Sequence, residues 1–368
     1  MASKGSNTAN EFAPATAQES SPESRLGFKR ESPAVFNSLD LYRGFAALPK
    51  SSTADSGSGS LPRLDVTDSS NPLKKDTIIL AQAQERGSSR DFQGDRPGSV
   101  KAEPETPARA WEMNLKHRSD QHGHADAVVY MPRGFDPSKP VNLMIYNHGW
   151  NTTAGKSYRD AKLGEQMAAA PPNTVLIVPE WQQSPGAESG RQGNLSKPGM
   201  YAGMVQEILD KTPGLQGKKL KDIENIGIIS HSAGYNPTEK MLADGTLGPK
   251  VKSLTLLDSA YNPAGMEAWL RTNANALARG EKRFTNIYHG TSGESQEQLK
   301  TIQKILTERG LPQAGLLVDQ GQAKKPLAPE QMANKSIIFK RSDVTDGKQG
   351  PHGSMPGLYV RTIAASLR

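Results

Sequence analysis

The run Ser230-His231-Ser232-Ala233-Gly234 has the residue types and the spacing for nucleophilic catalysis. It follows an apolar stretch at 226–229, so a buried strand that ends in a sharp turn is expected here. A serine hydroxyl is a weak nucleophile unless it is held exposed, beside a general base and opposite donors for the developing oxyanion. A tight strand-to-helix turn can hold it in this way. The run therefore predicts a nucleophilic Ser232, although an ordinary polar turn would also fit these five residues taken alone.

This run resembles the nucleophile elbow G-x-S-x-G of α/β-hydrolases, in which small residues on either side of the serine let the strand and the helix approach closely. Ser230 stands at the first glycine position, which keeps a small side chain and adds a hydroxyl. Asn236, Pro237 and Glu239 have the pattern of a separate helix start, with an N-cap, a proline at the first helical position and a glutamate after it. We therefore expect the helix to begin a turn later than in the family.

A second segment supports the resemblance. The apolar stretch 141–146 runs through Asn147 into His148-Gly149-Trp150, which is similar to the oxyanion loop after the third strand of the family. By this resemblance, the backbone N–H groups of Trp150 and Ala233 form the oxyanion hole. The resemblance also implies that His148 is structural, because the family places its catalytic base near the far end of the chain.

At that far end, the resemblance implies His352 as the base, because the family carries its histidine between the last strand and the last helix. A carboxylate must fix the tautomer of this histidine. Asp258 stands at the carboxyl end of an apolar stretch that is expected to be a strand, and catalytic groups collect at the carboxyl ends of strands in parallel sheets. Its position is similar to that of the acid in the family members whose acid follows strand six. After strand seven, the commoner place, Gly293 stands where the aspartate would be, so Glu294 is the fallback acid.

Apolar stretches without clean polar alternation recur from Ala125 onward and are separated by helix-like segments. This pattern is typical of a mostly parallel sheet with helices on both faces. The expected strands are 127–131, 141–146, 174–178, 223–230, 251–257, 283–289 and 336–340. The expected helices are 200–210, 238–243, 265–278, 294–309 and 355–367. We therefore predict an α/β-hydrolase domain at 111–368, built on a mostly parallel twisted sheet.

Residues 1–110 are rich in serine, proline, glycine and charged side chains, which predicts a disordered N-terminal region. Two short apolar stretches, 38–48 and 76–81, are candidates for ordering on the folded body or on a partner. Basic and acidic residues balance within 1–110, so the net charge of +7 resides in 111–368. A basic body attracts anionic surfaces, but no motif for sequence-specific nucleic-acid binding is present.

Several function classes are excluded. The chain of 368 residues has no cysteine, hence no cysteine nucleophile, disulfide or thiolate metal site. It has neither an apolar run long enough to span a membrane nor an apolar leader for Sec export. His117, His122 and His124 are candidate metal ligands, but they lie in a polar stretch with no element to preorganise them, so neither a metal nor another cofactor is expected. Segment 181–198 fits either a substrate-binding loop or a disordered insertion.

These features together predict a serine hydrolase that cleaves a carboxylic ester of a small molecule or a lipid through a Ser232, His352 and Asp258 triad and an acyl-enzyme. A serine peptidase or amidase and an acyltransferase on the same fold are alternatives. A catalytically inactive protein that uses the fold for binding is another. We expect a soluble protein, and its N-terminal region fits either a cytoplasmic location or export as a secreted effector by a non-Sec bacterial route.

Overall fold

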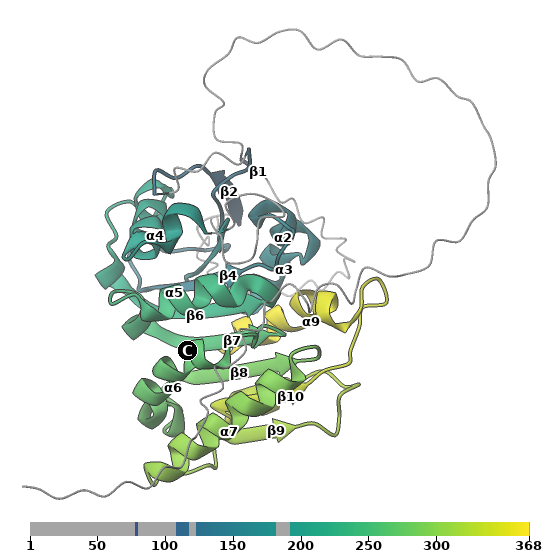
Figure 1. Cartoon of the computed structure of the whole chain (residues 1–368). Coiled ribbons are helices and arrows are strands. Elements are labelled where there is room, and N and C mark those ends of the chain that lie inside the picture. The colour runs from purple at the N-terminus through teal and green to yellow at the C-terminus, as the bar shows by residue number, and fades with distance from the viewer. Residues whose placement is uncertain (1–77, 80–107, 118–122, 182–191, 368) are drawn as a thin grey trace, which may run out of the picture. The chain divides into compact units, whose positions relative to one another are not determined.

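A ten-stranded sheet forms the centre of the computed structural model of the chain, which describes residues 78–79, 108–117, 123–181 and 192–367 (Figure 1). Its strands are β1 (Ile78–Ile79), β2 (Arg109–Met113), β3 (Ala127–Met131), β4 (Val141–Asn147), β5 (Thr174–Pro179), β6 (Ile223–His231), β7 (Val251–Leu257), β8 (Arg283–Tyr288), β9 (Leu316–Asp319) and β10 (Ile337–Arg341). They lie side by side in the order β1-β2-β3-β5-β4-β6-β7-β8-β10-β9. The β1–β2, β2–β3 and β3–β5 pairs are antiparallel, and the other pairs are parallel.

Helices cover both faces of this sheet. One apolar cluster joins it to α4 (Met200–Lys211), α5 (Tyr235–Ala243), α6 (Pro263–Ala278) and α7 (Ser292–Glu308). A second cluster, on the other face, joins it to α2 (Ala154–Asp160), α3 (Leu163–Gln166), α8 (Pro329–Asn334) and α9 (Pro351–Ala365). Strands such as β3 and β5 are buried at every residue. This burial on both faces explains why their sequences lack polar alternation. None of the described helices is long and apolar enough to cross a membrane.

The predicted α/β-hydrolase fold is confirmed. All seven expected strands are present, each within one residue of its predicted bounds. The three strands that were not expected, β1, β2 and β9, lie at or near the two edges of the sheet and are short. Helices α2, α3 and α8 were not expected either. Helix α9 begins at Pro351 rather than at 355, so residues 351–354, which were expected to precede the last helix, form its first turn.

The N-terminal region predicted to be disordered, including the stretch 38–48, lies outside the described residues, apart from β1 and the start of β2. The backbone of Ile78 and Ile79 pairs antiparallel with Trp111 and Ala110 of β2. These two residues belong to the stretch 76–81 that was a candidate for ordering on the folded body.

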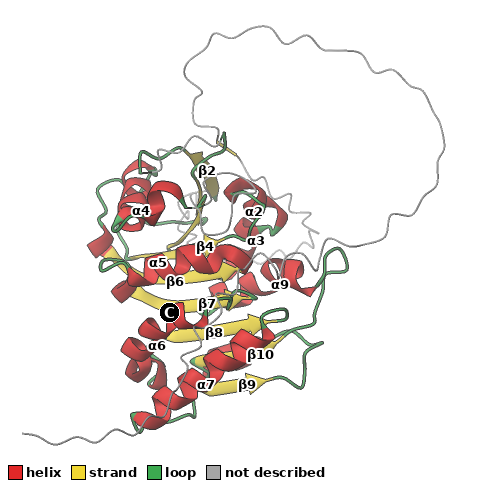
Figure 2. Ribbon diagram, viewed as in Figure 1, coloured by secondary structure: helices red, strands yellow, loops and turns green. Residues whose placement is uncertain are grey.

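The parallel strands place the functional residues at a single edge. The arrowheads of β6, β7 and β8 point the same way in Figure 2. The segments that follow β6, β7 and β8 therefore meet at the carboxyl edge of the sheet. Helix α9 contributes its N-terminal turn to this edge, through the contacts of His352 described next.

Candidate active site

Ser232 occupies the sharp turn between β6 and α5. The strand ends at His231, a 3-10 turn covers Ser232–Gly234, and α5 follows at Tyr235. The φ of Ser232 is 54°, in the left-handed region that residues with a side chain rarely adopt. Strain of this kind concentrates at functional sites, and it is what a nucleophile elbow requires in order to project its serine.

Close packing explains the glycine two residues after the serine. A Cβ on Gly234 would collide with the backbone carbonyl oxygen of Asn147, at the end of the neighbouring strand β4. Only glycine therefore fits at this position, and the turn can press against the loop that follows β4. The backbone of Asn147 is therefore the reason why a small residue is required at position 234.

The serine at the first glycine position has a partner of its own. The Ser259 hydroxyl donates to the carbonyl oxygen of Ser232 at 2.6 Å, and the Ser230 hydroxyl lies 2.6 Å from the Ser259 hydroxyl. Because Ser259 has one proton and uses it on Ser232, Ser230 donates to Ser259. This chain of hydroxyls ties the elbow to the residue that follows Asp258.

The separate helix start predicted at Asn236 is wrong. Gly234 is the N-cap of α5, with helical backbone angles and no side-chain cap, and Pro237 is the third residue of the helix. Proline is tolerated there because the first four N–H groups of a helix have no intrahelical acceptor, so the missing donor costs nothing.

The loop after β4 lies against the elbow. A Cβ on Gly149 would lie 3.2 Å from both the Ser232 Cβ and the His231 Nδ1. Trp150, the next residue, is 41% exposed, one of two large hydrophobic side chains in the described part of the chain to be exposed. The amides of Trp150 and Ala233, which were predicted to bind an oxyanion, therefore belong to the two segments that meet at Ser232.

His148 is fully buried beneath this loop. Its Nδ1 lies 2.8 Å from the carbonyl oxygen of Gly149, and its Nε2 lies 3.2 Å from Oε1 of Glu180. The indole N–H of Trp181 donates to the His148 carbonyl at 2.9 Å. These contacts fix the loop after β4, in keeping with the structural role inferred for His148.

Asp258 directly follows β7, and its carboxylate is fully buried. Oδ1 accepts hydrogen bonds from the Thr291 N–H and hydroxyl and from the His289 N–H, and Oδ2 accepts one from the Gly290 N–H. The fifth donor is Nδ1 of His352, at 2.7 Å from Oδ2. Burial opposes ionisation, but the hydrogen bonds from His352, His289 and Thr291 outweigh it and hold the pKa of Asp258 well below its usual range.

His352 lies in the first turn of α9 rather than in a loop, and its side chain is 40% exposed. Because the ionised Asp258 can only accept a hydrogen bond, Nδ1 of His352 carries the proton. Nε2 is then the basic nitrogen of a ring whose other nitrogen is fixed by a buried carboxylate. This is the arrangement that a general base requires.

His231 is a residue of this site that the sequence did not reveal. Its Nε2 lies 3.0 Å from the carbonyl oxygen of His352, so Nε2 is the protonated nitrogen, and the two rings are 4.9 Å apart. Burial, with the nearby His352 contributing less, lowers the pKa of His231 to about 3. His231 is therefore a neutral donor that anchors the backbone of His352.

Glu294, the fallback acid, lies in the first turn of α7. The described hydrogen bond of Nδ1 of His352 goes to Asp258 and not to Glu294. The loop before α7, which resembles the acid-bearing loop of the family, instead supplies the backbone donors of residues 289–291 to Asp258. The His289 side chain binds Asp343 at 2.8 Å, which anchors this loop from the other side.

The other predicted features lie away from this edge or outside the described residues. Nδ1 of His117 bonds Glu207 of α4 at 2.6 Å, and His122 falls in an undescribed segment. Across the described ranges, no group of three or more potential metal ligands is present. Most of segment 181–198 is likewise undescribed, except for Trp181 and the residues from 192 onward.

No protein-family model matches the sequence, and a search of curated proteins finds no relative. Several solved structures are similar to the chain. A feruloyl esterase module from Clostridium thermocellum is 13% identical, with a TM-score of 0.43, over 71% of this chain and 87% of that one. MPT51 of Mycobacterium tuberculosis is 11% identical, with a TM-score of 0.37, over 73% of this chain and 100% of that one. An S-formylglutathione hydrolase from Agrobacterium tumefaciens is 12% identical, with a TM-score of 0.34, over 71% and 95%. All three likenesses are distant, and the function proposed below rests on the side chains of this chain.

Proposed function

We propose that the protein is a serine hydrolase that cleaves a carboxylic ester, with Ser232 as the nucleophile, His352 as the base and acid, and Asp258 as the residue that orients His352. The single observation that carries the proposal is the 2.7 Å hydrogen bond from Nδ1 of His352 to the buried Asp258. It lies at the edge of the sheet where Ser232 adopts its left-handed conformation. His352 is linked to the serine segment through His231, the neighbour of Ser232, and no hydrogen bond between the Ser232 hydroxyl and His352 is present among the described residues. A base of fixed tautomer and a strained serine at one edge of the sheet are what covalent ester hydrolysis requires.

The reaction would proceed in two halves. Oγ of Ser232 attacks the ester carbonyl carbon while its proton passes to Nε2 of His352, and the new oxyanion is held by the N–H groups of Ala233 and Trp150. The intermediate collapses as His352 protonates the leaving alcohol, which leaves an acyl-enzyme. A water molecule, deprotonated by His352, then attacks the acyl carbon. As this second intermediate collapses, His352 returns the proton to Oγ of Ser232, which releases the carboxylic acid and restores the enzyme.

Asp258 contributes without taking up a proton. Its low pKa keeps it ionised throughout the neutral range, and its negative charge stabilises the imidazolium that forms on His352 during each half-reaction. The five donors around the carboxylate satisfy a buried charge that would otherwise be costly. The exposed indole of Trp150, beside the site, suits a substrate with an apolar group.

A fluorophosphonate probe tests this proposal, because it reacts covalently with an activated serine. The full-length chain should be labelled, and Ser232→Ala should not. The control Ser138→Ala, which removes an exposed serine distant in sequence from Ser232, should be labelled like the wild type. Chromogenic ester and anilide substrates then separate esterase from amidase activity, and added acceptor alcohols reveal acyl transfer. A folded wild-type chain that takes no label would refute the proposal and favour the catalytically inactive alternative.

The N-terminal region leaves two proposals for location, a cytoplasmic enzyme and one exported by a non-Sec bacterial route. Deletion of residues 1–50 distinguishes them when export is assayed from a bacterium with specialised secretion. Export of the full chain but not of the deletion variant supports the second, and retention of both supports the first.

A further inference from the structure

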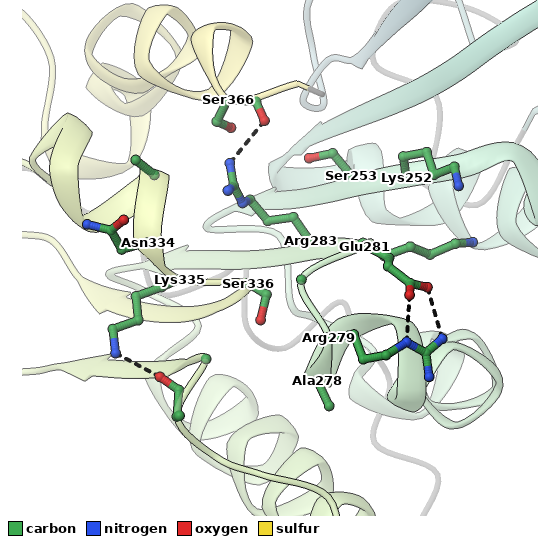
Figure 3. A pocket seen from close by; sticks show the side chains of 15 residues that line it. Lys252, Ser253, Ala278, Arg279, Glu281, Arg283, Asn334, Lys335, Ser336 and Ser366 are labelled. Atoms are coloured by element: carbon green, nitrogen blue, oxygen red, sulfur yellow. Dashed lines mark hydrogen bonds and ion pairs between the residues drawn. The ribbon is translucent and has the colours of Figure 1, made fainter.

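The structure points to a second site, which is independent of the proposed hydrolase function. We propose that a cavity at the amino-terminal edge of β7, β8 and β10 binds a phosphate group, as inorganic phosphate or as the phosphate of a small phosphomonoester (Figure 3). Its volume is about 310 Å³, at the lower end of the range for small-molecule sites. Because it lies where these strands begin, it is at the opposite edge of the sheet from Ser232.

Positive charge dominates the walls of this cavity. Five of its lining residues are cationic and one is acidic. The cations are Lys252, Arg279, Lys282, Arg283 and Lys335. The acidic residue, Glu281, is held by Arg279 through two contacts, at 2.6 and 2.9 Å. The one carboxylate of the cavity is thus already engaged by a guanidinium.

The three lysines of the cavity have no carboxylate partner within 4 Å in the part of the chain that the structure describes. Lys335 donates to the carbonyl oxygen of Ala314 at 2.8 Å, and Lys282 to that of Pro249 at 3.3 Å. Lys252 makes no side-chain hydrogen bond to any described residue. Burial and, to a smaller extent, repulsion by the charge of Lys252 lower the pKa of Lys282 to about 8. An anion in the cavity would offset the repulsion between these two lysines.

The floor of the cavity is polar and registered across three strands. Ser253 of β7 is the register partner of Arg283, and the N–H of Phe284, the next residue of β8, bonds the Ser336 carbonyl at the start of β10. Arg283 therefore lies between two serines. It reaches the carbonyl of Ser366 at 3.0 Å (Figure 3).

Both serine side chains of the floor have free hydrogen-bonding capacity. Ser253 and Ser336 line the cavity and are 5% and 6% exposed as whole residues, and neither makes a side-chain hydrogen bond to a described residue. Neither hydroxyl is among the buried polar atoms that lack a partner, so both oxygens are open to the cavity. Further along the same two strands, outside the cavity lining, the hydroxyls of the registered pair Thr255 and Thr285 are buried without a partner among the described residues.

Phosphate matches this set of groups. A guanidinium and hydroxyl donors are the groups that bind phosphate oxygens. The Lys252 side chain can turn toward a dianion, and Lys335 can do so by exchanging its bond to the Ala314 carbonyl for one to phosphate. In Figure 3 these two lysines lie on opposite sides of the cavity. The small volume favours a compact ligand over a polymer.

Calorimetric titration of the full-length chain with inorganic phosphate, at fixed ionic strength, tests the proposal. Ser336→Ala is the sharpest variant, because its hydroxyl bonds no described residue and the substitution removes a single oxygen atom. We expect saturable binding that Ser336→Ala weakens about tenfold, which corresponds to about 1.4 kcal/mol. The double variant K252Q/K335Q should weaken it at least as much.

Two matched controls isolate the site. Lys300→Gln removes an exposed lysine of α7 outside the cavity, and Ser232→Ala removes the proposed nucleophile; both should bind phosphate like the wild type. Tighter binding of glycerol phosphate than of inorganic phosphate would identify a phosphomonoester as the ligand, and equal binding would identify phosphate itself. Absence of saturable binding at millimolar phosphate, equal binding of sulfate, or binding that the cavity variants leave unchanged would each overturn the proposal.

Discussion

Replacing Asp258 by asparagine changes one carboxylate oxygen to an NH2 group and keeps the size of the side chain. In the wild type, Oδ1 accepts three hydrogen bonds, two from Thr291 and one from His289. Oδ2 accepts two, from His352 and Gly290. The asparagine oxygen should therefore take the Oδ1 position, because an NH2 group placed there would face three donors.

The NH2 group then points at Nδ1 of His352, which must become an acceptor. The proton of the imidazole moves to Nε2, and a protonated Nε2 cannot take the proton of Ser232. Loss of the correct tautomer in such a triad lowers kcat by about 10⁴-fold. This factor corresponds to about 5.4 kcal/mol of transition-state stabilisation.

The assay is the rate of hydrolysis of a nitrophenyl ester at neutral pH, together with the rate of fluorophosphonate labelling. Glu294→Gln is the matched control, since it neutralises the alternative acid by the same chemical change, and it should retain activity within about twofold of the wild type. Circular dichroism confirms that both variants are folded. An Asp258→Asn enzyme with the wild-type rate, or a 10⁴-fold loss in Glu294→Gln, would show that the acid has been misassigned.

Three further changes test individual contacts. His231→Ala removes the donor to the His352 carbonyl and should lower kcat about 100-fold with little change in KM. His231→Gln, whose side chain can still donate a hydrogen bond, should recover part of the rate. An equal loss of kcat in the two variants would contradict the anchoring role. Gly234→Ala forces a Cβ against the Asn147 carbonyl and should lower the free energy of unfolding in urea by about 3 kcal/mol, and unchanged stability would show that the turn is not tightly packed. Burial raises the pKa of Glu239 from 4.5 to about 7, so the free energy of unfolding of the wild type should fall as pH rises between these values. Glu239→Gln should abolish this slope and be more stable than the wild type by about 1 kcal/mol at pH above 7. Parallel pH profiles of stability for the two proteins would contradict a buried carboxyl at this position.

Much of the fold could be predicted because the central strands are buried on both faces. A strand such as β7 is buried at six of its seven residues, which leaves a continuous apolar stretch in the sequence. Strands at the margins give a weaker signal. β9 has four residues, none of them fully buried, and its pattern does not stand out from a loop. β2 follows a polar region and has two partly exposed residues.

The site was predictable to the extent that it depends on position along parallel strands. The turn after β6 and the residue after β7 meet because both strands end at one edge. The role of His231 could not be predicted in this way, since it depends on contact with a residue 121 positions away. The same is true of the N–H groups at 289–291, because backbone donors leave no signature in residue type.

Ser230 shows why a departure from a motif cannot be judged from the motif alone. A serine in place of glycine adds a hydroxyl at a fully buried position, and a buried hydroxyl without a partner would destabilise the turn. Ser259 supplies that partner, and its own hydroxyl donates a hydrogen bond to the carbonyl oxygen of Ser232. The two serines therefore compensate each other across neighbouring strands, and the substitution that weakened the sequence pattern adds a connection between the segment bearing the nucleophile and the segment bearing Asp258.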